Sequence, residues 1–398
     1  MVFRWSNDSD ARLVWIPFML FALSLLLLLL ISGLGMELLR SENHLLDLGA
    51  RGYQERDWPS ISIVVAARNE EESIEKATQS LLQQEYPKYE LIVVNDRSTD
   101  RTGEILGNLQ QAHSELKSIT IEELPAGWLG KCNALHQGAM AATGDWLLFT
   151  DADVSMRPDT LKVTIAYALA EKADHVTMAP QCEMPSWLLR AFVATFAFFF
   201  KLHVKPAQIS NPRSKSHVGI GAFNLVRRDV YLAIGGHEPI RLRPDDDLKL
   251  GKLLKSKGYH QRFANGVGLI SVPWYRSIGE MTRGLEKNSF AGIDYSISKW
   301  IAANVIVLTL FVLPFLLLLV THGWSFWVTV ASCALILLMG VFNSVKSGYR
   351  LDHGLFFPIG CLLFLFVFNR AIILTFWRKG IVWRNCFYGL DELKKNVV

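Results

Sequence analysis

The chain has 398 residues, of which 51% are hydrophobic and only 20% are charged, which predicts apolar segments in addition to a folded domain. A net charge of +4, spread along the chain, argues against a nucleic-acid-binding surface. The five cysteines include no Cys-x-x-Cys pair, which favours a reducing compartment with neither disulfides nor structural zinc.

Apolar segments at both ends of the chain predict membrane spans. Residues 13–31 are nearly all apolar, long enough to cross a bilayer and too long for the apolar core of a signal peptide. We therefore expect an N-terminal anchor within residues 1–40. Three more spans are predicted within residues 296–378, at residues 300–320, 324–341 and 355–376. Arg370 lies in the last of them and is expected to face protein, water or the interface.

The basic residues predict which side of the membrane the middle of the chain occupies. They flank the apolar segments at Arg40, Arg51, Lys346, Arg350, Arg378 and Lys379. The positive-inside rule then places the middle domain in the cytoplasm, at the cell (inner) membrane. Four spans would leave both termini outside, whereas the basic tail of residues 379–398 favours the cytoplasm. The conflict disappears if one apolar segment is re-entrant or interfacial, and the sequence leaves open which one.

Strands alternate with helices in the middle of the chain. After a polar juxtamembrane linker at residues 41–59, the predicted strands cover residues 60–67, 89–94, 118–121 and 146–150. This alternation predicts an α/β domain with a mostly parallel sheet over residues 60–295. The domain has neither a glycine-rich dinucleotide fingerprint nor a P-loop lysine, which argues against a dehydrogenase or a P-loop ATPase.

Asp151 and Asp153 follow the last of these strands, at the edge where open α/β sheets bind ligands. Two carboxylates so close repel each other unless a cation lies between them, so both are candidate ligands for Mg²⁺ or Mn²⁺ on a nucleotide. Lys131, at a helix start after two glycines, suits an anionic ligand. The alternative interpretation of the two aspartates is a strand end followed by a helix cap.

A second acidic group consists of Asp245, Asp246 and Asp247. Repulsion among three consecutive carboxylates predicts a raised pKa for at least one of them, which suits a base that takes a proton from a hydroxyl. The alternative is a solvated acidic turn that caps a helix at residues 248–257. Upstream, Gly235 and Gly236 would let the backbone approach a ligand closely.

Three motifs, in this order, resemble those of family 2 glycosyltransferases with a GT-A fold: Ala66-Ala67-Arg68-Asn69-Glu70-Glu71, Val94-Asn95-Asp96-Arg97-Ser98-Thr99-Asp100 and Asp151-Ala152-Asp153. The resemblance covers roughly residues 60–290. It implies a Rossmann-like GT-A domain whose first two loops hold the nucleotide of a sugar donor, through Ala66, Arg68, Glu70 and Asp96. It further implies that Asp151 and Asp153 hold the metal on the diphosphate of the donor.

The resemblance also implies a general base. The family pattern is an acidic residue, then the base, then an apolar helix start, and Asp246-Asp247-Leu248 matches it. Asp247 is therefore expected to be the base, with Asp246 as its neighbour.

The chain departs from the family pattern after the predicted base helix. Many membrane members have Gln-x-x-Arg-Trp there, whereas this chain has Thr282-Arg283-Gly284-Leu285-Glu286-Lys287-Asn288. Arg283 and Lys287 are expected to cover the leaving diphosphate from one helix face. The missing tryptophan disfavours processive polysaccharide synthesis. The segments Trp128-Leu129-Gly130-Lys131 and Lys287-Asn288-Ser289-Phe290 look like those of hopanoid-, carotenoid- and ceramide-type lipid glycosyltransferases.

An apolar and aromatic segment at residues 187–203 supports a lipid acceptor. Its length is typical of an interfacial helix, and a buried core helix is the alternative. The sequence thus predicts a membrane-anchored, metal-dependent, inverting glycosyltransferase. It moves one sugar from a nucleotide-diphosphate sugar, with a UDP-linked donor favoured, to a hydroxyl of a membrane lipid. A membrane polysaccharide or glycan synthase of the same family is the alternative, and a non-catalytic nucleotide-binding membrane scaffold is a more distant one.

Overall fold

The computed structural model describes residues 8–48, 57–384 and 386–396. Arg51 and most of the predicted linker therefore lie outside the described residues. The chain folds into two compact units. The helical unit comprises Met1–Arg40, Ser186–Leu202 and Ser296–Asn369. The sheet unit comprises Ser41–Pro185, His203–Tyr295 and Arg370–Val398.

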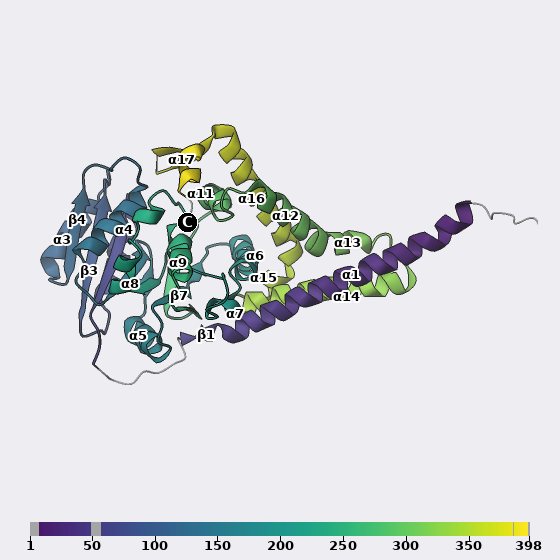
Figure 1. Ribbon diagram of the computed structural model, residues 1–398, viewed down its shortest axis with the longest axis horizontal. Coiled ribbons are helices and arrows are strands. Elements are labelled where there is room, and N and C mark those ends of the chain that lie inside the picture. The colour runs from purple at the N-terminus through teal and green to yellow at the C-terminus, as the bar shows by residue number, and fades with distance from the viewer. Residues whose placement is uncertain (1–7, 49–56, 385, 397–398) are drawn as a thin grey trace, which may run out of the picture. The chain divides into compact units, whose positions relative to one another are not determined.

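An eight-stranded sheet forms the centre of the sheet unit (Figure 1). Its strands, in spatial order, are β1 (Leu46–Asp47), β10 (Gln261–Asn265), β7 (His175–Ala179), β9 (Asn224–Arg227), β5 (Trp146–Asp151), β2 (Ile61–Ala67), β3 (Tyr89–Asp96) and β4 (Leu116–Ile121). All neighbours are parallel except β9, which runs antiparallel to both β5 and β7. The predicted α/β fold with a mostly parallel sheet is confirmed.

The middle strands are apolar on both faces because helices cover both. Alternate residues of β2 enter different hydrophobic clusters: Ile63 and Val65 join one, and Val64 joins the other. The first cluster includes residues of α2 (Ile74–Leu82), α3 (Thr102–Ala112) and α5 (Thr160–Ala170). The second includes residues of α4 (Gly130–Ala141), α8 (Arg228–Ala233) and α9 (Asp246–Ser256).

Shorter elements complete the sheet unit. A small sheet contains β6 (Ser155–Met156), β11 (Ile270–Pro273) and β8 (Gln181–Glu183). The short helices are α7 (Pro206–Ile209), η2 (Glu238–Ile240), α10 (Ile278–Gly284) and α11 (Glu286–Ala291). Residues 379–398, expected to be a basic tail, contain the hairpin β12 (Gly380–Trp383) and β13 (Cys386–Gly389) and the helix α17 (Leu390–Lys395).

A polar loop separates β2 from α2. Asn69 has a left-handed backbone with φ of 53°, and α2 begins only at Ile74. The Asn69 amide nitrogen donates to Ser98 Oγ at 3.0 Å, and Asn69 Oδ1 accepts from the Thr99 amide at 2.8 Å. These bonds tie the loop after β2 to the loop after β3, so the polar residues there form a fixed turn instead of a helix.

The helical unit contains long apolar helices. Its elements are α1 (Asp8–His44), α6 (Trp187–Val204), α12 (Ile297–Val307), the π-helical η3 (Leu308–Val312), α13 (Leu313–Leu317), α14 (Gly323–Lys346), α15 (Leu351–Leu355) and α16 (Phe357–Arg378). Five helical segments are long and apolar enough to cross a membrane: Trp15–His44, Trp187–Ile209, Ile297–Leu317, Gly323–Lys346 and Phe357–Arg378. The segment around α6 adds a fifth candidate to the four predicted spans.

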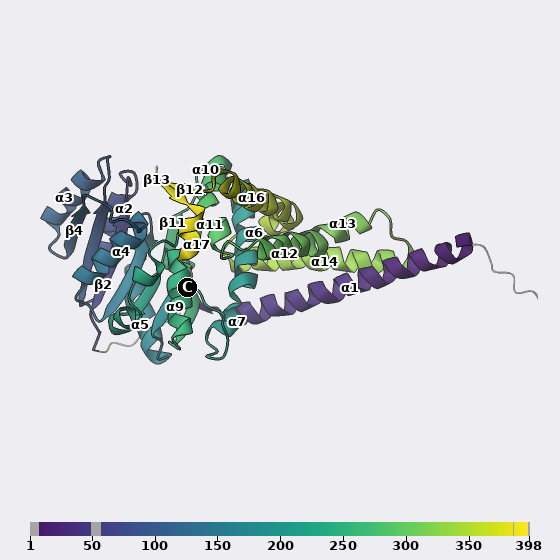
Figure 2. The ribbon, with the colours of Figure 1, turned by 45° about the horizontal axis from the view of Figure 1, so that its top comes forward.

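Helices α1 and α14 run side by side within the helical unit (Figures 1 and 2). Their small residues allow close approach: a Cβ placed on Gly35 would lie 3.4 Å from the Met339 sulfur. The hydroxyls of Ser24 and Thr329 are 2.9 Å apart and form a buried hydrogen bond between the two helices. An aromatic cluster of Phe198, Phe311 and Phe357 packs α6 against α16 and η3.

Helix α4 packs closely on the sheet at Gly138, and a substitution at this position tests that contact. A Cβ at this position would lie 2.5 Å from Val64 Cγ1, so Gly138→Ala is expected to destabilise the fold by about 1–3 kcal/mol through overpacking. Gly107 on α3 has nothing within 4 Å, so Gly107→Ala is the matched control and is expected to stabilise the protein by about 0.5–1 kcal/mol. Thermal unfolding in detergent measures both variants. Equal shifts of the two would contradict this account.

Candidate active site

Three parallel strands bring their carboxyl ends to one edge of the sheet. Ala66 lies opposite both Val94 and Asp151 in the strand register, so the loops after β2, β3 and β5 begin at the same level. This register explains why residues far apart in the sequence share one site. The structure thereby brings Arg68, Glu70, Asp96, Asp151 and Asp153 to the same edge.

Lys131 lies in the first turn of α4 and joins two of the acidic groups. Its Nζ is 2.5 Å from Asp151 Oδ1 and 4.0 Å from Asp246 Oδ1. Burial alone would lower the pKa of Lys131, but the carboxylates of Asp151, Asp246 and Asp247 raise it well above its ordinary value. Lys131 is therefore a permanent cation that holds the end of β5 beside the start of α9.

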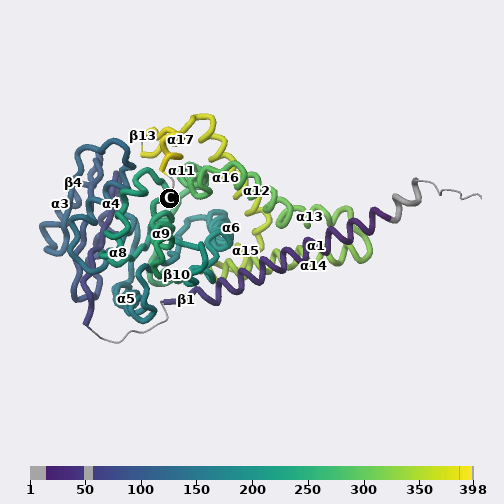
Figure 3. The backbone as a smooth tube through the Cα atoms, viewed as in Figure 1, coloured from purple at the N-terminus to yellow at the C-terminus, as the bar shows by residue number. Residues whose placement is uncertain are grey.

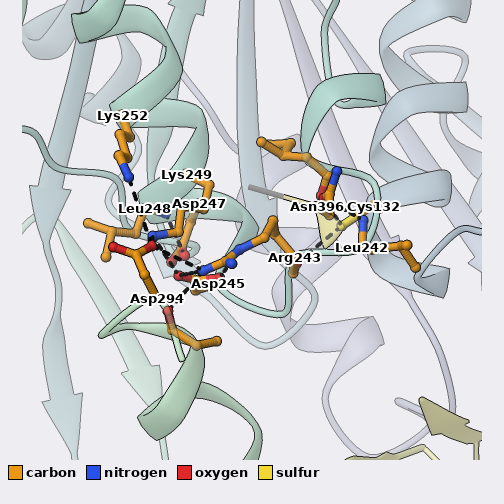
Figure 4. A network of polar contacts seen from close by, with 12 residues as sticks. Cys132, Leu242, Arg243, Asp245, Asp247, Leu248, Lys249, Lys252, Asp294 and Asn396 are labelled. Atoms are coloured by element: carbon orange, nitrogen blue, oxygen red, sulfur yellow. Dashed lines mark hydrogen bonds and ion pairs between the residues drawn. The ribbon is translucent and has the colours of Figure 1, made fainter. Parts of the chain in front are cut away.

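The three consecutive aspartates have different partners, and Figure 4 shows Asp245 within a network of polar contacts. The Asp245 carboxylate accepts a bidentate pair from Arg243 at 2.9 and 3.0 Å, and both residues are buried. Lys249 lies 3.4 Å from Asp245 and 2.6 Å from Asp294, which extends this pair into a buried ion network. Asp245 therefore stabilises the fold, and only the other two aspartates reach the pocket.

Asp246 and Asp247 differ in their surroundings. Asp246 is 3% exposed, and burial together with the carboxylates of Asp247 and Asp151 raises its pKa to about 7, against the opposing charge of Lys131. Asp247 Oδ2 accepts the Gly221 amide at 2.7 Å, and its Oδ1 accepts the Leu248 amide at 2.7 Å. Burial also raises the pKa of Asp247. The expected raised pKa within this acidic group is thus present.

A pocket collects these groups in the sheet unit. It is lined by Lys131, Leu135, Phe149, Thr150, Asp151, Gly221, Asn224, His237, Asp246 and Asp247. No sequence motif pointed to His237, which is 1% exposed and whose pKa burial lowers to about 3, so the ring is neutral. Tyr231 Oη accepts the His237 amide at 3.2 Å and lies 2.7 Å from His237 Nδ1. These contacts hold the ring in place at the pocket.

Asp151 and Asp153 form the candidate metal site. Burial would raise the pKa of Asp151, but Lys131 holds it below its ordinary value. For Asp153, burial and the carboxylates of Asp151 and Glu70 raise the pKa to about 7, so its negative charge is not compensated. Among the described residues no group of three His, Cys, Asp or Glu is arranged for a metal ion. The two carboxylates fit an ion that completes its shell with phosphate and water oxygens, as Mg²⁺ and Mn²⁺ do.

The residues expected at the nucleotide lie in the first two loops. Asp96 is 3% exposed and accepts a bidentate pair from Arg97 at 2.8 and 3.0 Å, with Arg68 3.8 Å away. Glu70 accepts a hydrogen bond from Ser73 and forms an ion pair with Arg384. Ala66 lies between β3 and β5 in the sheet.

Lys287 and Arg283, expected on one helix face, lie on the two short helices α11 and α10. Lys287 is half-buried, and burial together with the charge of Lys131 lowers its pKa to about 8 despite the opposing carboxylates of Asp151 and Asp246. Arg283 is exposed, and no side-chain hydrogen bond or ion pair joins it to the site within the described chain. The structure therefore brings Lys287, but not Arg283, to the acidic groups.

Two neighbours of these groups were missed in the sequence. Trp383 and Arg384 lie at the tip of the β12–β13 hairpin and contact Lys287 and Glu70, respectively. The only sequence signal for this segment was its positive charge. Its apolar alternation is too short to predict a hairpin against a site more than 300 residues away in sequence.

Comparison with known proteins agrees with this geometry. Residues 62–235 match the description "Glycosyl transferase family 2". This segment belongs to glycosyltransferase family 2. Two 4,4'-diaponeurosporenoate glycosyltransferases of Staphylococcus aureus are similar to it. That of strain bovine RF122 / ET3-1 is 26% identical over 62% of this chain and 65% of its own length. That of strain USA300 is 25% identical over 54% of this chain and 57% of its own length. The chain therefore matches less than two thirds of these relatives.

A solved structure supports the fold. The mannosyltransferase PcManGT from Pyrobaculum calidifontis, in complex with GDP-Man and Mn²⁺, superposes with a TM-score of 0.50. It has 16% sequence identity, and the alignment covers 90% of this chain and 99% of that chain. The GT-A-like arrangement of the sheet and its helices is thereby confirmed.

The pKa of Asp246 predicts a pH-dependent stability. Because its pKa rises from 3.8 to about 7 on folding, the folded protein binds this proton more tightly than the unfolded chain. The stabilisation is complete below pH 4, is lost as pH rises towards 7, and its loss costs on the order of 4 kcal/mol at most. Asp246→Asn is therefore expected to raise the unfolding temperature more at pH 8 than at pH 5.

The measurement is thermal unfolding in detergent with a chelator at both pH values. Asp391→Asn removes an exposed carboxylate of α17 and is the matched control. An Asp246→Asn shift that is the same at both pH values would contradict the buried, proton-binding carboxyl.

Proposed function

We propose that the protein transfers a single sugar from a nucleotide-diphosphate sugar, with UDP-sugars favoured, to a hydroxyl of a membrane lipid, with inversion. The observation that carries this proposal is one pocket that contains Lys131, Asp151, Asp246 and Asp247. In this pocket the Lys131 ammonium lies beside carboxyl groups whose pKa values differ. Carboxyl groups with pKa values shifted apart in this way are typical of acid–base catalysis. Family membership and the donor-bound mannosyltransferase of the same fold support a nucleotide-sugar donor.

The first two loops are proposed to hold the nucleotide, through Ala66, Arg68, Glu70 and Asp96. Asp151 and Asp153 would hold a divalent ion, Mg²⁺ or Mn²⁺. Bound there, the ion supplies positive charge to the diphosphate. Lys287 is the nearby ammonium that can add to this charge when the diphosphate leaves. Arg283 would join only if α10 moves, because its side chain is exposed.

Asp247 is proposed to take the proton of the acceptor hydroxyl, which attacks the anomeric carbon while the diphosphate leaves on the opposite side. Two backbone amides hold the Asp247 carboxylate in place, and a carboxylate has lone pairs left for a third partner. The negative charge of Asp247 helps to raise the pKa of Asp246, and two adjacent carboxyls titrate together.

Two observations support the proposal that the acceptor is a lipid. The relatives from Staphylococcus aureus are named as glycosyltransferases of a carotenoid acid. Five long apolar helical segments indicate membrane association. A glycan synthase of the same family would instead release long polymers, and a non-catalytic scaffold would bind nucleotide without turnover.

We also propose which of the apolar helices cross the membrane, with the sheet unit on one side of the bilayer. Pro185 and His203 both belong to the sheet unit, so in this proposal α6 between them begins and ends on that side. Tyr295 and Arg370 also belong to this unit, so an even number of crossings lies between them. We therefore propose that α6 is interfacial, that α12–α13 and α14 cross, and that α16, which contains Arg370, does not. With α1 as an anchor, this arrangement removes the conflict over the basic tail.

The function is tested with purified protein, Mn²⁺ and a panel of nucleotide sugars, by measuring nucleotide release with and without a total lipid extract. We expect lipid-dependent release from one donor. Asp247→Asn is expected to lower transfer by about 10²–10⁴-fold while donor binding is retained, because only proton removal is lost. Asp391→Asn is the matched control. Full activity of Asp247→Asn would exclude it as the base, and lipid-independent release would favour another acceptor.

The proposed topology is tested by cysteine labelling in right-side-out spheroplasts with a membrane-impermeant maleimide. His322→Cys, between α13 and α14, is expected to react directly. Lys395→Cys on α17 is expected to react only after permeabilisation, because α17 belongs to the sheet unit. Unmodified protein reports the background from its own cysteines. Direct labelling of Lys395→Cys would contradict an even number of crossings.

A further inference from the structure

The C-terminal segment is anchored to the sheet unit along its length. Arg378 Nη1 donates to Glu286 Oε1 at 2.6 Å at the end of α16. Asn396 Nδ2 donates to the Pro239 carbonyl at 2.9 Å, beyond α17. Between these anchors, the β12–β13 hairpin lies beside α11 (Figures 2 and 3). The hairpin is therefore held at a fixed place next to Lys287.

Arg384 lies in the turn of the hairpin, and its guanidinium extends to the loop after β2. Trp383 pairs with Cys386, so a two-residue turn joins the strands, and its second residue, Asn385, lies outside the described residues. Arg384 has a φ of 49°, the left-handed conformation that such tight turns require. Its side chain donates to the Arg68 carbonyl and to the Glu70 carboxylate. Arg384 thus reaches the loop expected to hold the nucleotide.

The Arg384 guanidinium has more N–H donors than its described contacts use. Within the described chain its guanidinium uses two N–H groups, whereas an arginine has five, and its side chain is 41% exposed. Its remaining N–H groups are therefore available to a second ligand beside Glu70.

Trp383 contacts the other available cation. Lys287 Nζ lies 4.1 Å from the centroid of the Trp383 ring, a cation–π contact. Lys131 is already held between Asp151 and Asp246, so its charge is largely compensated by carboxylates. Lys287 and Arg384 are two further cations near the site: Lys287 contacts the hairpin through Trp383, and Arg384 belongs to the hairpin.

We propose that the C-terminal hairpin completes the donor site: Arg384 binds the diphosphate of the nucleotide sugar, and Trp383 positions the Lys287 ammonium for the same group. This inference rests on the proposed function and deepens it. Arg384 forms an ion pair with one carboxylate oxygen of Glu70. A diphosphate offers stronger, bidentate acceptors to a guanidinium than one carboxylate oxygen does.

The test compares binding of nucleoside diphosphates and monophosphates to the full chain in detergent. UDP, GDP, UMP and GMP are titrated with Mn²⁺ by calorimetry against wild type, Arg384→Ala and Arg384→Lys. We expect Arg384→Ala to weaken diphosphate binding about tenfold or more, as a charge-assisted hydrogen bond is lost, with less than about a twofold change for the monophosphate. Arg384→Lys keeps the charge and is expected to fall between. Lys395→Ala, which removes an exposed charge from the same segment, is expected to bind like wild type.

Trp383 is tested by rescue. Trp383→Leu is expected to weaken diphosphate binding, whereas Trp383→Phe keeps an aromatic face for Lys287 and is expected to restore most of it. A hairpin that only anchors the chain end would make Trp383→Phe and Trp383→Leu alike, and that result overturns the role of Trp383.

The outcomes separate this inference from the proposed function. Unchanged diphosphate binding in Arg384→Ala, or equal loss of diphosphate and monophosphate in both Arg384 variants, overturns the inference while donor binding by wild type stands. Absence of any nucleotide binding by wild type overturns the proposed function and this inference with it.

Discussion

The contact of Lys131 with the acidic groups of two elements is the interaction on which the site depends. Asp151 at the end of β5 and Asp246 at the start of α9 both lie near Lys131 Nζ. Without that cation their negative charges would repel each other. The Lys131 ammonium between them reduces this repulsion. The position of α4 follows from this requirement, since its first turn must deliver Lys131 to both carboxylates.

The three consecutive aspartates have different roles: one stabilises the fold, and the other two face the pocket. Asp245 is satisfied by Arg243 and Lys249 in a buried network, so it fixes the start of α9. That fixed start leaves Asp246 and Asp247 facing the pocket without a full set of partners. The raised pKa of Asp246 is a cost in stability, and such costs are common where a carboxyl must take a proton.

The end of the chain links three parts of the sheet unit. Glu286 accepts from both Arg370 and Arg378, so the last turns of α16 are tied to α11, which carries Lys287. The hairpin then returns to Glu70 on the first loop of the sheet. One short segment therefore joins the helix that carries Lys287 to the loop that carries Glu70.

The alternating strands and helices could be predicted from the sequence, because their apolar periodicity reports burial of a few neighbouring residues. The sequence also shows that carboxylates end the strands, and the parallel register then brings Asp96 and Asp151 together without further information. The different roles of Asp245 and Asp246 could not be predicted, because they depend on Arg243, Lys131 and Asp294, which come from different elements.

The ion pair of Arg384 with Glu70, 314 residues away in sequence, results from tertiary packing. No local pattern encodes that contact. Its geometry results from the packing of α11, α16 and the hairpin, and the free energy that holds it comes from many contacts distributed over all three.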